Sequence, residues 1–285
     1  MKNILVTGAS GLLGSHVVKH LMNKQCHVIV SILPEEKSTY VPLEGVEVIV
    51  NDDIFNGNLP HISTVINCAF ARSNQAQDLA LAIDFTQKLI EGFKSSHVDS
   101  IINISSQGVY KRLPIGELST EESPIEPIDL YSMAKYAVEK MFETSGLKNV
   151  TNVRLASINM KQRFLYHFVQ KAKNKETITI NSPKQYGSLL DVEDAAEALA
   201  RLALLLENDR KPIYNLGTGN QTSLIEFAEL VNKVGKRFDA QAMIDIQDNG
   251  TTNTAGVDIS LISNDCNWTP IITNEQMIEN FFLFD

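Results

Sequence analysis

The feature that most constrains this chain is a glycine-rich turn near its start. Residues 4–6 are apolar and predict a short buried strand, and from Leu12 onward apolar residues recur at helical spacing. Between them lie Gly8, Gly11 and Gly14. Gly8 permits a tight turn, Gly11 lets the backbone approach a pyrophosphate, and Gly14 lets the helix pack close to the strand. Because the start of a helix offers free N–H groups to a phosphate, the turn predicts a dinucleotide-binding unit.

Length and composition are those of an ordinary globular protein. The 285 residues are 44% hydrophobic and 21% charged, which suits an α/β core with a smaller lobe. The net charge is −9, and no cluster of Lys and Arg interrupts the acidic balance. This charge argues against binding to nucleic acid or to an anionic membrane surface, so we expect a small-molecule substrate.

The chain also carries no sign of export or of a structural metal. Its first strand begins at residue 3, which leaves no room for a signal peptide, and the apolar stretch at residues 202–206 is too short to span a bilayer. We therefore expect a cytoplasmic protein. Cys26, Cys68 and Cys266 are odd in number and far apart, which predicts free thiols with no disulfide framework and no metal site.

A second strand, predicted at residues 27–32, bears on the choice of nicotinamide cofactor. A dinucleotide-binding unit normally carries Asp or Glu at the end of this strand to hold the ribose 2′-OH, whereas this chain has Ser31 and Ile32 there. The missing carboxylate removes the repulsion that would exclude a 2′-phosphate, and Lys37 could offer that phosphate a positive charge. We expect NAD or NADP, with a slight preference for NADP.

Strands and helices alternate along the rest of the chain. Further strands are predicted at 46–50, 64–69, 100–110, 150–158 and 214–217, and helices at 78–94, 129–141, 164–175, 191–203 and 223–235. The alternation predicts a Rossmann-like, doubly wound parallel sheet with a smaller C-terminal substrate lobe. Residues 1–160 are expected to form the dinucleotide-binding domain, with 188–220 returning to it, and residues 161–187 and 221–285 to form the substrate lobe.

The expected cofactor contacts follow from this sheet. In open α/β sheets ligands bind at the carboxyl ends of the strands, so residues just after successive strands are candidates. They are Gly8, Ser10, Gly11, Leu12, Leu13, Ser31, Asp53, Ile54, Cys68 and Ala69.

Three motifs together carry a family resemblance. They are the glycine turn, the pair Ser105-Ser106 before Val109-Tyr110, and Tyr131 followed four residues later by Lys135. On its own, the last spacing is typical of a packed ring beside an exposed ammonium group. In this order, however, the motifs resemble the extended short-chain dehydrogenase/reductase family, the NAD-dependent epimerases and dehydratases that modify nucleotide sugars. Segments 190–196, 214–219 and 268–270 also resemble later motifs of that family.

The resemblance implies an NAD(P)-dependent oxidoreductase or epimerase that acts on a sugar, with the substrate linked to a nucleotide. It implies that Ser106 is the hydrogen-bonding serine, Tyr131 the acid/base and Lys135 its partner, with Tyr131 and Lys135 also contacting the cofactor. A nearby ammonium group and nicotinamide cation would lower the pKa of Tyr131 from about 10, so that it can exchange a proton with a sugar hydroxyl or ketone. A homodimer is compatible with these features.

Departures from the family pattern keep alternatives open. Dehydratases carry an acidic pair after the catalytic hydroxyl, where this chain has Gln107 and Gly108, so dehydration is disfavoured. Epimerase and reductase share all the residues named above. An NADPH-dependent reductase of a non-sugar carbonyl, or a dinucleotide-binding regulatory protein without catalysis, are the alternatives.

The arginines that grip the substrate diphosphate in many nucleotide-sugar enzymes are also replaced. Gly187 stands at the first such position, and Thr254 and Ala255 lie near the second. Arginine is the residue best suited to a bidentate phosphate contact. Lys161 and Arg163 at the boundary between the lobes are the candidates to substitute.

Overall fold

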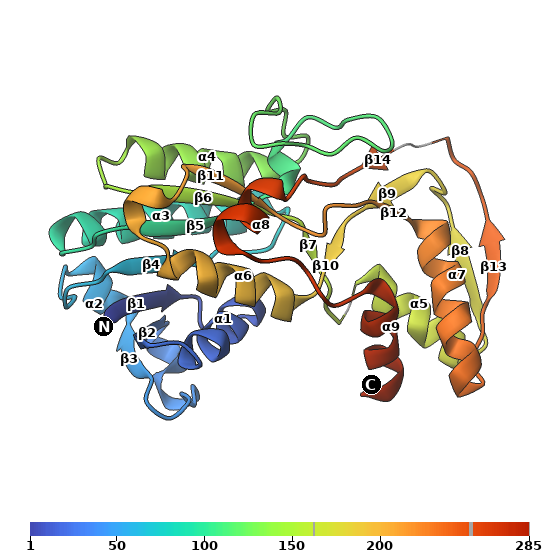
Figure 1. Ribbon diagram of the computed structural model, residues 1–285, viewed down its shortest axis with the longest axis horizontal. Coiled ribbons are helices and arrows are strands. Elements are labelled where there is room, and N and C mark those ends of the chain that lie inside the picture. Colours follow the sequence, from blue (N-terminus) through green and yellow to red (C-terminus); the bar gives the residue numbers. More distant parts are fainter. Residues whose placement is uncertain (162, 251–252, 285) are drawn as a thin grey trace.

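Seven parallel strands form the central sheet of the computed structural model, which describes residues 1–161, 163–250 and 253–284 (Figure 1). The strands lie in the order β11-β6-β5-β4-β1-β2-β3. Their bounds are β1 Lys2–Thr7, β2 Cys26–Ile32, β3 Glu47–Val50, β4 Thr64–Asn67, β5 Ile101–Ser106, β6 Val150–Leu155 and β11 Ile213–Leu216. From β1 the chain passes through β2 to the edge strand β3. It then returns to β4, beside β1, and passes through β5 and β6 to the other edge strand, β11. This confirms the predicted doubly wound sheet, whose switch point at β1 and β4 is where such folds bind ligands.

Helices cover both faces of the sheet. One face carries α1 (Leu12–Met22), α6 (Val192–Leu204) and α8 (Ser260–Cys266), and the other α2 (Asn51–Phe55), α3 (Ala76–Ser95) and α4 (Leu130–Thr144). The side chains of alternate strand residues point to opposite faces of the sheet. Ile4 and Val6 pack in the core under α1 and α6, whereas Leu5 packs under α3 and α4. Among the described residues, no helix combines the length and the apolar character that crossing a membrane requires.

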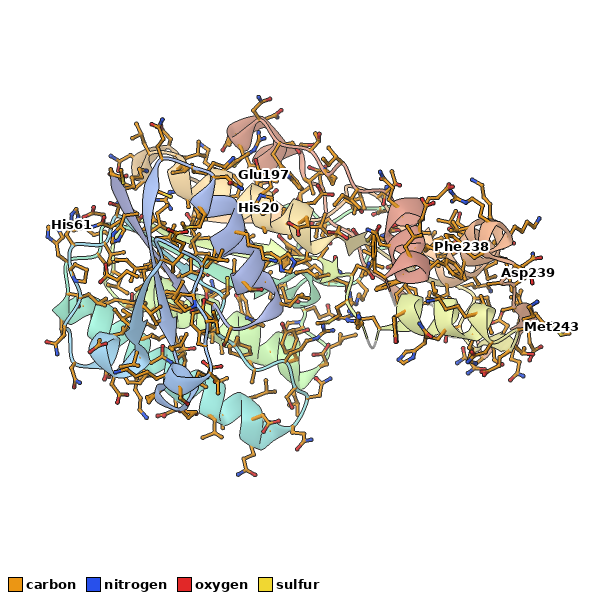
Figure 2. All side chains as sticks on the ribbon, turned by 90° about the horizontal axis from the view of Figure 1, so that it is seen from below. His20, His61, Glu197, Phe238, Asp239 and Met243 are labelled. Atoms are coloured by element: carbon orange, nitrogen blue, oxygen red, sulfur yellow. The ribbon has the colours of Figure 1, made fainter. Side chains whose placement is uncertain are left out.

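A smaller lobe stands beside the carboxyl ends of the strands, on the right of Figure 1. Its elements are α5 (Phe164–Lys173), α7 (Leu224–Gly235), α9 (Asn274–Leu283) and a parallel pair of strands, β8 (Thr177–Ile180) and β13 (Met243–Ile246). The three helices share a core of their own, in which Leu165, Phe227 and Met277 are buried together. Phe238, Asp239 and Met243 mark its outer end in Figure 2.

Short strand pairs connect the lobes, and here the structure corrects one predicted element. The strand expected over 150–158 is interrupted at Ala156, whose N–H donates to the carbonyl oxygen of Leu216 at 2.7 Å. The chain then leaves the main sheet as β7 (Ser157–Ile158), which pairs with β10 (Leu189–Leu190). Next to them β9 (Gln185–Gly187) pairs with β12 (Thr222–Ser223) and β14 (Asn253–Thr254). These pairs hold the smaller lobe over the end of the sheet.

Polar contacts fix α6 against the segments that pack beside it. His20 of α1 lies 2.9 Å from a carboxylate oxygen of Glu197 on α6, and the two face each other in Figure 2. Asp194, in the first turn of α6, accepts hydrogen bonds from the backbone N–H groups of Ile271 and Ile272. Asp194 is thus a structural acid that ties α6 to the segment before α9.

The domain bounds stay a prediction, and the packing refines them in one place. Residues Ile262, Cys266 and Trp268 belong to the core under α1 and α6 rather than to that of the smaller lobe. The segment around α8 therefore packs on the sheet, although the sequence analysis assigns all of 221–285 to the substrate lobe. The short α8, at seven residues, has too weak a helical pattern to have been predicted.

Candidate active site

A cavity of about 670 Å³ opens at the carboxyl ends of the parallel strands, between the two lobes. Its walls include the glycine turn after β1, the end of β5 and the start of α4 on one side. On the other side they include β7, β9 and the start of α5. The volume is within the usual range of ligand sites, roughly 300–1,000 Å³. Both lobes therefore contribute to one candidate site.

The glycine turn has the backbone geometry that its three glycines predict. Gly8 has a φ of +67°, and a Cβ there would lie 2.8 Å from the backbone nitrogen of Ala69. A Cβ on Gly14 would lie 2.2 Å from the carbonyl oxygen of Gly8, so α1 can pack this close only with glycine. Gly11 begins the helix, and no acidic side chain stands in the first turn of α1. The start of α1 thus presents free N–H groups to the cavity, which suits a phosphate.

The predicted cofactor residues are partly brought together. Those that line the cavity are Gly8, Gly11, Leu12, Leu13 and Cys68, with Tyr131 and Lys135. Those outside its described lining are Ser10, Ser31, Asp53, Ile54 and Ala69. Their surroundings explain why.

Three of the residues outside the lining, Asp53, Ile54 and Ser31, are held in other parts of the structure. Asp53 accepts a hydrogen bond from the N–H of Val50 at 3.1 Å and so caps α2, a short helix that the sequence analysis did not predict. Ile54 is fully buried in the core between the sheet and α3. Ser31 is buried at the end of β2, and its Oγ has no hydrogen-bond partner among the described residues. Lys37 is exposed in the turn that follows.

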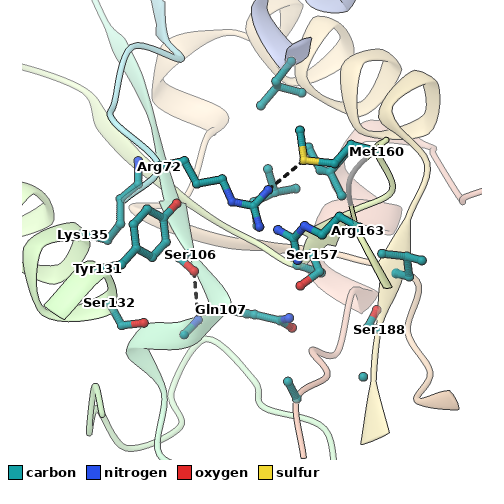
Figure 3. A pocket seen from close by; sticks show the side chains of 18 of the residues that line it. Arg72, Ser106, Gln107, Tyr131, Ser132, Lys135, Ser157, Met160, Arg163 and Ser188 are labelled. Carbon is teal, nitrogen blue, oxygen red and sulfur yellow. Dashed lines mark hydrogen bonds between the residues drawn. The ribbon is translucent and has the colours of Figure 1, made fainter. Parts of the chain in front are cut away.

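The three predicted catalytic residues lie together in the cavity (Figure 3). Ser106 ends β5, and its Oγ accepts a hydrogen bond from the N–H of Gly108 at 3.1 Å. Tyr131 is in the first turn of α4, which Asp129 begins as its N-cap. Lys135 lies one turn later, with its Nζ 6.0 Å from the centre of the Tyr131 ring. Residues that are distant in sequence thus meet at the place where the resemblance implies catalysis.

Burial controls the ionisation of this cluster. Burial lowers the pKa of Lys135 to about 7, against the smaller opposing effects of Cys68 and Glu139. Its Nζ donates to the carbonyl oxygen of Ile104 at 2.8 Å. Burial also raises the pKa of Tyr131 above its usual value, and the cation that opposes this rise is Arg72. Burial therefore favours the neutral phenol of Tyr131, and the expected lowering of its pKa by Lys135 together with a nicotinamide cation stays a prediction.

A buried ion pair supports the floor of the site. Glu139, on the same helix as Lys135, accepts hydrogen bonds from Arg154 of β6 at 3.0 Å and 2.8 Å and also from the hydroxyl of Ser105. Both charged side chains are almost completely buried. Because a paired arginine can be buried where a free one cannot, this contact fixes α4 against the ends of β5 and β6.

The cavity carries more positive charge than the sequence analysis foresaw. Gly187 lines it at the position, and Ala255 near the position, where the resemblance implies arginine, but Arg72, Arg112 and Arg163 line it too. Of these, only Arg163 was a sequence candidate. Arg72 and Arg112 lie in loops five and six residues beyond strands β4 and β5, so a search for cations in such loops could have found them.

Asp129 is the one acid among the described residues that line the cavity. Its carboxylate accepts hydrogen bonds from the N–H and the hydroxyl of Ser132, at 2.9 Å and 3.1 Å. The negative charge is thus used in capping α4. In a protein with a net charge of −9, the cavity is a locally positive place that suits an anionic ligand.

One group of potential metal ligands lies outside this site. His61 Nε2 is 2.7 Å from a carboxylate oxygen of Asp99, and His97 Nε2 is 3.4 Å from the other oxygen. These residues precede β4 and β5, so they lie at the amino ends of the strands, whereas the cavity lies at the carboxyl ends. Figure 2 labels His61 at this end of the molecule. The three cysteines, on which the expectation of no metal site rests, are free, and no sequence pattern joins His61 to His97 and Asp99.

The chain is similar to known proteins over most of its length. The model of the NAD dependent epimerase/dehydratase family matches residues 4–217. A low-salt glycan biosynthesis protein of Haloferax volcanii is 25% identical over 258 residues, which cover 80% of this chain and 81% of the relative.

Solved structures of low sequence identity share the fold. The UDP-glucose 4-epimerase of Thermotoga maritima, solved with UDP-glucose, has a TM-score of 0.78 at 21% identity and covers 98% of each chain. The UDP-glucuronic acid 4-epimerase of Bacillus cereus, solved with UDP-glucuronic acid and NAD, has a TM-score of 0.77 at 19% identity and covers 97% of this chain and 96% of that one. Since the family model matches well over half of the residues, the chain belongs to the NAD dependent epimerase/dehydratase family.

Proposed function

We propose that this protein is an NAD(P)-dependent enzyme that acts on a nucleotide-linked sugar by hydride transfer, as an epimerase or an oxidoreductase. The observation that carries the proposal is the meeting of Ser106, Tyr131 and Lys135 in one cavity with the glycine turn. Membership of the family supports the same chemistry. A bound nicotinamide supplies the hydride transfer, which side chains alone do not perform.

The residues present fit such a cofactor. The start of α1 would hold its diphosphate, because its free N–H groups face the cavity and its first turn carries no acid. Gly14 lets α1 pack close to the turn after β1, since a Cβ there would lie too near the carbonyl oxygen of Gly8. Lys135 and Cys68 line the cavity near Tyr131, where the nicotinamide ribose would contact Lys135. Ser31 is buried and lies outside the cavity lining, so the slight preference for NADP rests on the missing carboxylate alone.

Titration with both reduced cofactors tests that preference. We expect NADPH to bind at least as tightly as NADH, because no carboxylate at Ser31 repels the 2′-phosphate. Tighter binding of NADH by about tenfold, roughly 1.4 kcal/mol, would reverse the preference. The Bacillus cereus relative was solved with NAD, which makes this comparison informative.

Tyr131 would move the proton of the oxygen on the reacting carbon. Its neutral phenol can donate a proton to a ketone oxygen without first being protonated, and Ser106 would hold the same oxygen by a hydrogen bond. In the reverse direction Tyr131 must accept a proton. Lys135, with a pKa of about 7, can lose or gain a proton near neutral pH and so can support either direction.

A nucleotide-linked sugar suits the charge of the cavity. Three arginines, Arg72, Arg112 and Arg163, provide positive charge for a diphosphate. Gly187 has no side chain at the position where the resemblance implies an arginine. The named substrates of two structural neighbours, UDP-glucose and UDP-glucuronic acid, are the first compounds to test. A homodimer and a cytoplasmic location stay predictions of the sequence.

The decisive experiment follows the sugar and the nicotinamide separately. The protein is incubated with NAD or NADP and each UDP-sugar, the sugar is followed by NMR, and the nicotinamide by its absorbance. An epimerase interconverts two sugars with no net change in the nicotinamide, whereas an oxidoreductase changes both. If a panel of nucleotide sugars is left unchanged while simple ketones are reduced with NADPH, the non-sugar reductase becomes the better description.

A further inference from the structure

Two histidines and an aspartate meet outside the cavity, just before β4 and β5 begin. We propose that His61, His97 and Asp99 together bind a divalent transition-metal ion such as zinc. The site goes beyond the proposed function, because it lies at the amino ends of the strands and the cavity at their carboxyl ends. Figure 2 shows His61 at the end of the molecule away from the smaller lobe. The proposal would replace the expectation, based on the cysteines, that the chain holds no metal.

The three side chains converge on one point. His61 Nε2 lies 2.7 Å from one carboxylate oxygen of Asp99, and His97 Nε2 lies 3.4 Å from the other. The centres of the two imidazole rings are 4.3 Å apart. One ligand atom from each residue lies within 4.8 Å of the ligand atoms of the other two. Ligands about 2.1 Å from a tetrahedral zinc ion lie about 3.4 Å from one another, so small side-chain adjustments bring these atoms to coordination distance.

The backbone holds the two segments that carry these ligands side by side. The N–H of Ile62 donates to the carbonyl oxygen of His97 at 2.9 Å, and the N–H of Asp99 donates to the carbonyl oxygen of Ile62 at 3.0 Å. Ile62, which is fully buried, thus forms a parallel bridge with Val98. Successive residues of an extended segment point to opposite faces, so His61, His97 and Asp99 share the face opposite the bridged pair.

Two asparagines fix the same segments from outside. Asn3 Nδ2 donates to the carbonyl oxygen of His61 at 2.9 Å, and Asn149 Nδ2 donates to the carbonyl oxygen of Asp99 at 3.1 Å. Both contacts use the backbone and leave the imidazole and the carboxylate available for coordination. A ligand set held in this way is preorganised, which lowers the ordering cost of binding.

The donor atoms select the class of metal. Imidazole nitrogen suits zinc, copper, nickel and iron, whereas magnesium and calcium prefer sites built from oxygen. Two histidines and one carboxylate are also a known ligand set of zinc, with water in the fourth position. His61 and His97 are exposed, so water can reach the fourth position here.

Lys2 is the nearby cation that acts against a metal ion. It interacts electrostatically with Asp99, but its Nζ donates to the carbonyl oxygens of Leu205 at 2.7 Å and Leu204 at 3.3 Å. The hydrogen bonds of its ammonium group therefore go to the end of α6, and the two oxygens of Asp99 face the histidines.

A second histidine cluster shows how a purely electrostatic contact differs. The two ring nitrogens of His20 lie 2.9 Å and 2.8 Å from carboxylate oxygens of Glu197 and Glu193. Glu197 is also paired with Lys24 and Arg201. A ring that donates from both nitrogens has no lone pair for a metal, and permanent cations already neutralise this acid. The proposed site differs because both of its histidines direct the same nitrogen, Nε2, at one carboxylate.

Zinc binding is measured by calorimetry on the untagged protein after treatment with a chelator. The variants are His61→Ala, His97→Ala and Asp99→Asn. The matched control is His27→Ala, because His27 forms an exposed pair with Glu47 elsewhere on the surface. We expect each ligand variant to bind zinc at least tenfold more weakly, since loss of even an outer-shell partner costs about 10–100-fold. The control should bind zinc as tightly as the unmodified protein.

Two further measurements identify the kind of site. Cobalt(II) in place of zinc should give a visible absorption band that the ligand variants lack, and magnesium should not displace either ion. Zinc should also raise the thermal unfolding midpoint of the unmodified protein and of His27→Ala, but not that of the ligand variants, because an ion bound only by the folded state stabilises it.

Equal zinc affinity in His61→Ala, His97→Ala and the control would overturn the proposal, as would displacement of zinc by an equal concentration of magnesium. Circular dichroism checks that each variant keeps its fold. Tyr131→Phe should bind zinc as the unmodified protein does. The metal site can therefore fail while the proposed function holds, and the proposed function can fail while zinc still binds.

Discussion

The two ends of the cavity are built in different ways. At the cofactor end the working parts are backbone groups, placed by Gly8, Gly11 and Gly14 within a single turn. At the substrate end they are side chains from separate elements, such as Arg72 after β4 and Arg163 at the start of α5. The first end is encoded by local spacing, which any reader of the sequence can see. The second exists only once the sheet has brought distant segments together.

Removal of the Tyr131 hydroxyl should have the largest effect and should be confined to the chemistry. Tyr131→Phe keeps the ring and the helix but removes the group placed to move the proton, so turnover should fall by roughly 10²–10⁴. Nicotinamide affinity should change little, because the phosphates are expected at the glycine turn. Steady-state rates and cofactor titration measure the two effects. Near-normal turnover in this variant would move the proton transfer to another residue or to water.

Loss of the buried carboxylate under the site should have the next largest effect, on stability. Glu139→Gln leaves Arg154 buried without its counter-charge, and this should lower the free energy of unfolding by about 3–5 kcal/mol. Denaturant unfolding measures the change. Asp84→Asn, which breaks an exposed pair with Lys88, is the matched control and should change stability little. Equal effects of the two variants would mean that the buried pair does not support the floor of the cavity.

These contrasts show which parts of the molecule the sequence could predict. The parallel sheet and the glycine turn follow from apolar periodicity and glycine spacing, which are local, and the structure confirms the sheet. The ion pair of Glu139 with Arg154 and the approach of Arg72 to Tyr131 depend on contacts between distant segments, and no local pattern encodes them. The strand expected over 150–158 likewise divides after Ala156 because Ser157 and Ile158 pair with β10 instead of β11, a tertiary contact.

The ionisation of the site also depends on the whole fold. The lowering of the Tyr131 pKa by an ammonium group together with a nicotinamide cation stays a prediction. In the structure burial raises the pKa of Tyr131 and lowers that of Lys135. Burial depends on the whole fold, so the helical spacing alone could not reveal it.

The cofactor end can be tested by closing the space that its backbone needs. Gly14→Ala would place a Cβ 2.2 Å from the carbonyl oxygen of Gly8, so α1 must move. We expect a loss of about 1–3 kcal/mol in the free energy of unfolding, with weaker nicotinamide binding. Gly187→Ala is the control, since a Cβ there would meet no atom of the described residues beyond its chain neighbours within 4 Å. If Gly14→Ala bound the cofactor normally, close packing of α1 would not define this end.

Lys135 belongs to both ends of the cavity, and its replacement should give the most informative pH dependence. Burial lowers its pKa from 10.5 to about 7. Below pH 7 both the folded and the unfolded protein hold the proton, and the burial penalty is fully present. Between pH 7 and 10.5 the unfolded chain binds more protons than the folded protein, so stability should rise with pH by up to about 1.4 kcal/mol per unit.

Lys135→Met removes this titration, so the stability of the variant relative to the unmodified protein should decline as pH rises from 7 to 9. Denaturant unfolding at several pH values measures the difference, and parallel profiles would contradict the lowered pKa. The same variant should lose turnover and part of its nicotinamide affinity, because Lys135 is proposed to contact both Tyr131 and the ribose. Tyr131→Phe should lose turnover alone. A Lys135→Met variant with full cofactor affinity would therefore place this lysine wholly at the substrate end and sharpen the division between the two.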